Sequence, residues 1–263
     1  MNSYLELLKA NSNLKQQTKP HSIEMVVLNN ITTNPIKDYL EYSCALNGIA
    51  ANITFGDYDN IVQNAQEFDL EHKAVIVFWE LVNCVHGLEY KIDSFSPDFV
   101  KSLEKKIQTE LLLAFDAFSK ASMVVMNCFT GMAFSYMNTQ TSALEALAAR
   151  LNLFCEQQAP KSIKWVTIDK CLMNAGIENT IDYKGYLKNK LLYKHQFYWT
   201  YVQLIQPYFN AFTGQVNKLL ALDCDNTLWS GILGEDGAQH IDMDENTYKG
   251  QAFAAAQFRA LGL

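Results

Sequence analysis

The chain has 263 residues, of which 49% are hydrophobic and 19% are charged, and its formal net charge at pH 7 is −7. This composition is typical of a folded protein with one large domain, or with one domain and part of a second, and it excludes a disordered or fibrous chain. The acidic balance argues against a protein that binds nucleic acid or a membrane surface, because both partners require concentrated Lys and Arg.

The first twenty residues, MNSYLELLKANSNLKQQTKP, are expected to form a helical segment ahead of the first domain. They lack the basic region and the apolar core of a signal peptide. No apolar run approaches a length of about 18–20 residues, which a membrane span requires. The six cysteines are scattered without a CxxC pair, which is typical of free thiols in a reducing compartment. Together these features predict a cytoplasmic protein.

Short apolar runs alternate along the chain with longer segments of helical period. The expected strands cover residues 23–29, 51–55, 74–79, 121–127, 163–168 and 218–223. The expected helices lie near residues 34–47, 98–119, 139–157, 184–190 and 196–212. Continuous hydrophobicity in the strands suits a sheet that is covered on both faces. The alternation therefore predicts an α/β fold with a doubly wound, mostly parallel sheet.

The first five strands are expected to form one domain over residues 21–213, followed by a short linker, NAFTGQVN. Residues 217–263 then supply one strand, a glycine-rich excursion and one helix, which is expected to begin near Asp244 and to end at Gly262. These elements cannot bury a core alone, so the second unit is predicted to be incomplete. Its apolar surface is expected to be disordered, packed on the first domain or buried in a homodimer.

Two carboxylates, Asp223 and Asp225, stand at the end of the last apolar run. Residues two apart in a strand point to the same side, and the carboxyl ends of parallel strands form the edge where open α/β sheets bind ligands. Two close carboxylates repel each other unless a cation or a proton lies between them, and Mg²⁺ is the simplest such cation because it prefers oxygen ligands. One carboxylate could then attack phosphorus while the second acts as general acid and base. The alternative is that these residues only cap the following turn.

The run LLALDCDNTLW resembles the first motif of the haloacid dehalogenase superfamily, a hydrophobic stretch followed by DxDx[TV]. Its continuation, SGILGEDG, resembles the FkbH-like branch of that superfamily. FkbH-like proteins carry an N-terminal domain with the flavodoxin-like topology of SGNH hydrolases. The segments IEMVVLNNITTNPIKDYL and FGDYDN resemble the opening of that domain.

By this resemblance, Asp223 is the nucleophile and a Mg²⁺ ligand, and Asp225 is the general acid and base, with its backbone carbonyl as a second metal ligand. Thr227 and Asn226 are expected to bind the phosphate, and residues 229–237 to form a flap over the site. The resemblance also implies an enzyme that dephosphorylates a phosphorylated three-carbon metabolite. Such an enzyme loads the glyceryl group on an acyl carrier protein for polyketide-type assembly.

The later motifs of the superfamily, a Ser or Thr, a Lys and an acidic pair, would all lie beyond Leu263. Without them an aspartyl-phosphate would have too few cations to offset its charge. The chain is therefore expected to be an N-terminal fragment that is inactive as a phosphatase by itself.

Two other functions are consistent with the sequence. One is a non-catalytic binding domain for an acyl carrier protein or a small metabolite, with a pocket at the strand ends. Its polar candidates are Asn29, Asn30, Asn83 and Asn127. The other is an SGNH-type esterase with Thr32 or Thr33 in place of the usual Ser, and with His195 and Asp182 completing the site. The competing interpretation of His195 is a polar residue that merely opens a helix.

Overall fold

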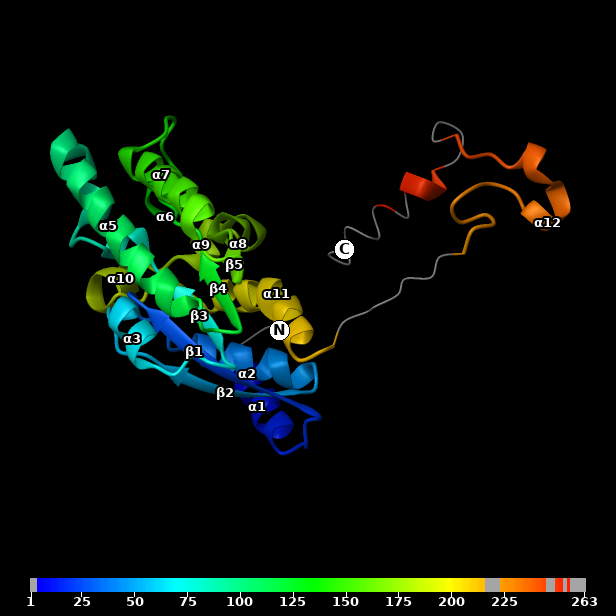
Figure 1. The fold of residues 1–263 in the computed structure, drawn as a ribbon, viewed down its shortest axis with the longest axis horizontal. Coiled ribbons are helices and arrows are strands. Elements are labelled where there is room, and N and C mark those ends of the chain that lie inside the picture. The colour runs from blue at the N-terminus through cyan, green and yellow to red at the C-terminus, as the bar shows by residue number, and fades with distance from the viewer. Residues whose placement is uncertain (1–3, 216–222, 245–248, 253–254, 256–263) are drawn as a thin grey trace. The chain divides into compact units, whose positions relative to one another are not determined.

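The computed structural model describes residues 4–215, 223–244, 249–252 and 255. The chain divides into two units, one up to Gln215 and one from Val216 onward (Figure 1). The first unit contains the sheet, and the second contains the turn with Asp223 and Asp225.

The sheet has five strands, all parallel, in the order β2-β1-β3-β4-β5 (Figure 1). The strands are β1 (His21–Asn29), β2 (Ile49–Phe55), β3 (Ala74–Phe78), β4 (Met123–Asn127) and β5 (Ile163–Val166). Val27 aligns with Ile76 across β1 and β3, and Val77 aligns with Met126 across β3 and β4. β3 and β4 are buried along their whole length, as expected for strands covered on both faces. The predicted α/β fold with a doubly wound parallel sheet is confirmed.

Helices cover both faces of this sheet (Figure 1). One group, in which neighbours pack on one another, contains α1 (Tyr4–Lys15), α2 (Ile36–Leu46), α8 (Ile168–Ala175) and α11 (His195–Phe212). The second group contains α3 (Ile61–Glu67), α5 (Pro97–Phe118) and α7 (Ala143–Gln158). The strand order reverses after β2, and right-handed crossovers therefore put α2 and α3 on opposite faces.

Shorter helical segments complete the connections. In the first unit they are η1 (Leu81–Asn83), α4 (Leu88–Lys91), η2 (Ile92–Ser94), α6 (Met132–Ser135), α9 (Ile177–Thr180) and α10 (Tyr183–Asn189). In the second unit they are α12 (Leu233–Asp236) and η3 (Ala238–His240). Within the described parts of the chain, no helix combines the length and the apolar character that a membrane crossing needs.

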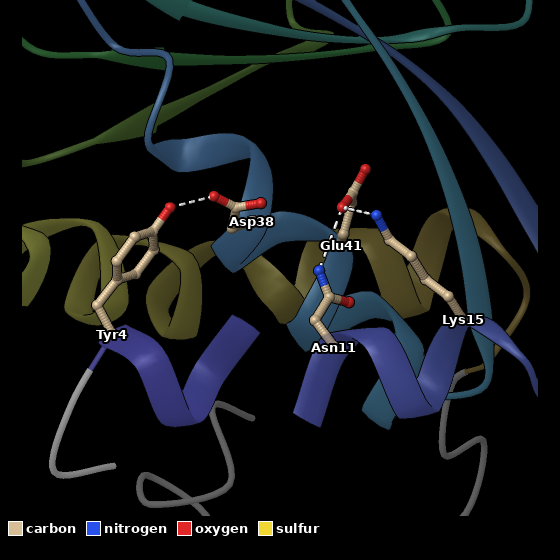
Figure 2. A network of polar contacts seen from close by, with 5 residues as sticks. All are labelled: Tyr4, Asn11, Lys15, Asp38 and Glu41. Atoms are coloured by element: carbon tan, nitrogen blue, oxygen red, sulfur yellow. Dashed lines mark hydrogen bonds and ion pairs between the residues drawn. The ribbon is translucent and has the colours of Figure 1, made fainter. Parts of the chain in front are cut away.

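Polar contacts fasten α1 to α2 (Figure 2). The Tyr4 hydroxyl donates a hydrogen bond to the Asp38 carboxylate. Further along α1, Asn11 Nδ2 lies 3.2 Å from Glu41 Oε2, and Lys15 Nζ forms an ion pair with the same oxygen at 2.7 Å. The N-terminal helix therefore belongs to the first unit.

An aromatic cluster packs α11 and the residues before it against β3. The ring centroids of Phe78 and Tyr201 are 4.8 Å apart, and Tyr193 stacks on Phe197 at 3.6 Å. All four side chains are buried. This packing fixes Tyr193 close to the carboxyl end of β3.

Element boundaries differ from the prediction at several points. The strand predicted over residues 163–168 ends at Val166, because Thr167 is already the N-cap of α8. The sequence analysis did not predict α3 and α8, since two turns of helix carry little periodic signal. The strand predicted over residues 218–223 lies outside the described residues except for Asp223, and the helix predicted from Asp244 to Gly262 lies largely outside them.

A capping box begins α7. Ser142 Oγ accepts a hydrogen bond from Glu145 N at 3.1 Å, and Glu145 Oε2 accepts one from Ser142 N at 2.8 Å. The bond from Ser142 N is the main reason that the pKa of the Glu145 carboxyl lies below its usual value.

Replacing Ser142 by Ala should lower the free energy of unfolding by about 1 kcal/mol, because the first turn of α7 loses this cap. Urea denaturation measures the effect. Ser102→Ala, on an exposed face of α5, should change the same quantity by less than about 0.5 kcal/mol. Equal losses in the two variants would contradict a stabilising role for the cap.

Candidate functional site

The second unit holds Asp223, Asp225, Asn226 and Thr227 in one tight turn. The carbonyl oxygen of Cys224 accepts hydrogen bonds from Thr227 N at 3.2 Å and from Leu228 N at 2.9 Å. Asn226 adopts a left-handed conformation with φ of 54°, which Asn tolerates better than most residues. The structure thus brings together the four predicted site residues of this unit.

Asp225 connects this turn to the segment that follows it. Its Oδ1 accepts hydrogen bonds from Trp229 Nε1 at 3.1 Å and from Leu233 N at 3.2 Å. Asp223 is exposed, and its Oδ1 accepts the N–H of the next residue at 2.9 Å. The two carboxylates therefore differ in environment, because Asp225 is held by the segment after it while Asp223 faces solvent.

The segment predicted to form a flap is a closed loop. Ser230 and Asp242 pair through two backbone hydrogen bonds of 2.9 and 3.0 Å. At the base of the loop, Gly231 N donates to Asn226 Oδ1 at 3.0 Å, and Asn226 N donates to the Gly231 carbonyl at 3.3 Å. Gly231 has φ of 104°, so a side chain at this position would strain the backbone. These contacts hold the loop at a fixed place beside Asp225.

The turn presents oxygen atoms, which are the ligands that hard cations prefer. Its carboxylates suit a cation such as Mg²⁺, which takes oxygen ligands and completes its coordination with water or phosphate. Within the described residues no three His, Cys, Asp or Glu side chains gather closely enough to hold a metal ion by themselves. The turn therefore offers part of a coordination shell.

The first unit places its predicted site residues at the carboxyl ends of β1, β3 and β4. Asn30 Oδ1 accepts a hydrogen bond from Glu80 N at 2.7 Å, and Asn30 Nδ2 donates to the Glu80 carbonyl at 2.9 Å. Asn127 Oδ1 accepts one from Trp79 N at 3.0 Å. The carbonyl of Asn29 accepts a hydrogen bond from Asp59 N at 3.0 Å. Asn30 and Asn127 therefore join neighbouring strand ends with their side chains.

Glu80 is a buried carboxyl that the sequence analysis missed. It is 2% exposed, and its Oε1 accepts hydrogen bonds from Tyr193 Oη at 2.7 Å and from Asn127 Nδ2 at 3.1 Å. Burial raises the pKa of Glu80 to about 7, although the Tyr193 hydrogen bond acts in the opposite direction. The signal that could have found it is a single acidic residue directly after the apolar run AVIVFW.

A cavity of about 340 Å³ opens at this edge of the sheet. It lies where the strand order reverses between β1 and β3, which is where doubly wound sheets bind ligands. Its lining comes from the segments after β1, β2 and β3 and from α3 and α5: Asn30, Asp59, Ile61, Val62, Gln63, Trp79, Asn83, Cys84, Lys106, Glu110 and Leu113. Asn30 and Asn83 were predicted to lie at such a pocket, whereas its charged residues were not.

No protein-family model matches the chain, and the search of curated proteins gives no match. The chain is similar in fold to a solved structure. This is the N-terminal part of the protein BF1531 from Bacteroides fragilis, which contains a phosphatase domain and was crystallised in complex with Mg. The TM-score is 0.64 at 17% sequence identity, and the match covers 100% of this chain and 71% of that chain.

A second solved structure is a member of the lipolytic G-D-S-L family from Veillonella parvula DSM 2008. Its TM-score is 0.43 at 10% identity, over 72% of this chain and 98% of that chain. The similarity to the BF1531 structure shows a common fold. The resemblance to FkbH-like proteins rests on the sequence motifs alone.

Thr32, Asp182 and His195, which were proposed for an esterase site, have other contacts, whereas the buried Thr33 hydroxyl has no hydrogen-bond partner among the described residues. Thr32 Oγ1 donates to the carbonyl of Asn189 at 2.7 Å, and Asp182 accepts the N–H of Gly185 at 2.9 Å as the N-cap of α10. His195 stacks on Tyr4, with ring centroids 4.1 Å apart. No hydrogen bond of the described residues joins Thr32 to His195 or His195 to Asp182, so the contacts favour the interpretation of His195 as a residue that opens a helix.

Proposed function

We propose that the second unit contributes the nucleophile turn of a Mg²⁺-dependent phosphatase or phosphotransferase. The observation that carries the proposal is the pair of carboxylates on one turn, with Asp225 held by Trp229 Nε1 and Leu233 N beside an exposed Asp223. The motif in LDCDNTLW and the fold shared with a chain that contains a phosphatase domain support it.

In this reaction an oxygen of Asp223 attacks the phosphorus of the substrate, and the bond from phosphorus to the substrate oxygen breaks. Asp225, in its protonated form, donates its proton to the leaving oxygen. Water then attacks the phosphorus of the aspartyl-phosphate while Asp225 takes up a proton from that water. Phosphate leaves and Asp223 is regenerated as a carboxylate. Thr227 and Asn226 are proposed to bind phosphate oxygens.

The oxygen donors of this turn fit Mg²⁺, and the Asp223 carboxylate and the Asp225 backbone carbonyl would hold it, which leaves the Asp225 carboxyl for proton transfer. When bound, the ion offsets negative charge on the transferring phosphoryl group. The presence of Mg in the BF1531 structure supports this choice of ion.

The substrate and acceptor are proposed from the FkbH-like motif. We expect a phosphorylated three-carbon metabolite as the phosphoryl donor and an acyl carrier protein as the acceptor of the glyceryl group. A polyketide-type pathway in the cytoplasm is the expected setting, and homodimerisation stays a prediction.

The test is a phosphate-release assay on the full gene product with 3-phosphoglycerate, in Mg²⁺ and in excess EDTA. We expect release in Mg²⁺ at least about tenfold above the EDTA sample, with recovery when Mg²⁺ is added back. Intact-mass analysis of holo-acyl carrier protein should show a glyceryl adduct in a parallel mixture supplied with 1,3-bisphosphoglycerate, because its acyl phosphate provides the activated carboxyl group that thioester formation needs. Phosphate release that is insensitive to EDTA, or absent in both samples, would overturn the proposal.

A second candidate function is favoured by the cavity of the first unit. The cavity lies at the ligand-binding edge of the sheet, and the Ser nucleophile of SGNH hydrolases has no counterpart in LNNITTNP. A non-catalytic binding role for the first unit is compatible with phosphoryl transfer in the second.

A further inference from the structure

The cavity of the first unit presents hydrogen-bond acceptors that the protein leaves open. Asn83 Nδ2 donates to the carbonyl of Asn30 and, at 3.1 Å, to Tyr58 Oη. These bonds fix the carboxamide, and no described residue donates to its Oδ1. Because an amide oxygen accepts up to two hydrogen bonds, Asn83 offers a positioned acceptor to a ligand.

Asp59 supplies a second and stronger acceptor. It lies in the segment after β2, and its backbone N–H bonds to the Asn29 carbonyl at 3.0 Å, which anchors it beside the end of β1. Within the described residues no side chain or backbone N–H donates to the Asp59 carboxylate, and no cation lies within ion-pair distance of it. Partial burial raises the pKa of Asp59, while Lys106 and Lys190 act in the opposite direction.

The other charged residues of the cavity are already paired. Lys106 Nζ lies 3.7 Å from Glu110 Oε1, one turn further along α5. Lys190 lies outside the lining, and its Nζ sits 4.4 Å from the centre of the Tyr186 ring. The lining residues Asp59, Glu110 and Lys106 together leave one negative charge, which belongs to Asp59. A ligand that pairs with Asp59 and Asn83 would therefore bring hydrogen-bond donors, and the charge of Asp59 favours a positive charge on that ligand.

The walls limit the size of that ligand. α3 and α5 lie side by side (Figure 1). They contribute the apolar side chains of Ile61, Val62 and Leu113 to the lining of the cavity. A volume of about 340 Å³ lies at the lower end of the range for small-molecule pockets, about 300–1,000 Å³. The cavity therefore suits a compact metabolite rather than a polymer.

We propose that this cavity binds a small primary amine that also carries hydroxyl groups, with the ammonium group on Asp59 and on Asn83 Oδ1. The apolar walls contact the carbon chain, and the Lys106–Glu110 pair and the Gln63 carboxamide face the hydroxyl groups. This assignment concerns the first unit and involves no phosphate chemistry, so its outcome is independent of the function proposed for Asp223 and Asp225.

Three probes of nearly equal size separate the contribution of charge from that of shape. They are serinol, which is a cationic amino-diol, neutral glycerol and anionic glycerate. Titration of the full gene product by isothermal calorimetry should show the tightest binding for serinol, at least about tenfold tighter than for glycerol, because a charge-assisted hydrogen bond is stronger than a neutral one. Equal binding of serinol and glycerol, no binding of serinol, or tighter binding of glycerate that persists in Asp223→Asn, and is therefore not binding at the proposed phosphatase turn, would each overturn the proposal.

The variant Asp59→Asn removes the charge and keeps a residue that tolerates the left-handed backbone found there, where φ is 58°. We expect it to weaken serinol binding at least about tenfold and to leave the thermal unfolding midpoint nearly unchanged. The matched control is Asp57→Asn, two residues earlier on the same exposed loop and outside the lining. Unchanged serinol binding in Asp59→Asn, or an equal loss in both variants, would contradict the assignment.

Discussion

Replacing Asp223 by Asn should reduce Mg²⁺-dependent phosphate release by the full gene product at least about 10³-fold. A carboxamide is a poor nucleophile toward phosphorus and carries no charge for the metal ion. Asn has nearly the same shape as Asp, and its Oδ1 can still accept the N–H of Cys224, so the turn should keep its conformation. The measurement is the turnover number at saturating 3-phosphoglycerate.

The control removes a carboxylate far from this turn in the sequence. Asp116 lies on an exposed face of α5 in the first unit, and Asp116→Asn should leave the turnover number within about twofold of the unmodified protein. The thermal unfolding midpoint of both variants reports whether the fold persists. Activity of Asp223→Asn above one tenth of the unmodified level would remove Asp223 from the role of nucleophile.

Replacing Glu80 by Gln should remove a pH dependence of stability that the buried carboxyl creates. The pKa of Glu80 is raised from 4.5 to about 7 in the folded protein, so the folded state favours the neutral form. Its contribution to stability is complete below pH 4.5, falls as the pH rises through 7, and is lost above it. A difference of about 2.5 pKa units corresponds to about 3 kcal/mol between these limits.

The expected result concerns the difference in unfolding free energy between the unmodified protein and Glu80→Gln. Between pH 4.5 and pH 8, the unmodified protein should lose about 3 kcal/mol of unfolding free energy relative to Glu80→Gln. Urea denaturation at a series of pH values measures this loss. The control Glu156→Gln, on an exposed face of α7, should track the unmodified protein across the same range. If both variants follow the same pH profile, Glu80 titrates as an exposed carboxyl would, and the role assigned to its burial is wrong.

The sheet could be predicted because each inner strand is marked by a short run of residues that are neighbours in the sequence. Each inner strand contains a continuous apolar run, such as AVIVFW or MVVM, and such runs separated by helical segments indicate a parallel sheet covered on both faces. The turn at Asp223 could be predicted equally well, because its four site residues lie within five consecutive positions of the sequence. What could not be predicted was the loop contact from Leu233 N to Asp225, which depends on how the chain folds back eight residues later.

The cavity of the first unit was only partly predictable. Strand ends point to Asn30 and Asn83, since all strands of a parallel sheet end at the same edge. Asp59 and Lys106 reach that edge from a loop and from the middle of a helix, so neither residue carries a local signal of its position. Glu80 shows the same limit, because its partner Tyr193 is 113 residues away in the sequence.

The paired hydrogen bonds of Asn30 also restrict how the first unit could acquire a serine nucleophile at the end of β1. A carboxamide places a donor and an acceptor side by side, and here they satisfy both the N–H and the carbonyl of Glu80. A serine hydroxyl at position 30 could not reach both groups, and would leave one of them unpaired beneath the cavity at a cost of about 1–3 kcal/mol. A single substitution that introduced a nucleophile here would therefore destabilise the strand ends that position it. The strand ends are therefore stabilised by an asparagine side chain, and a nucleophilic side chain at the same position would not stabilise them equally well.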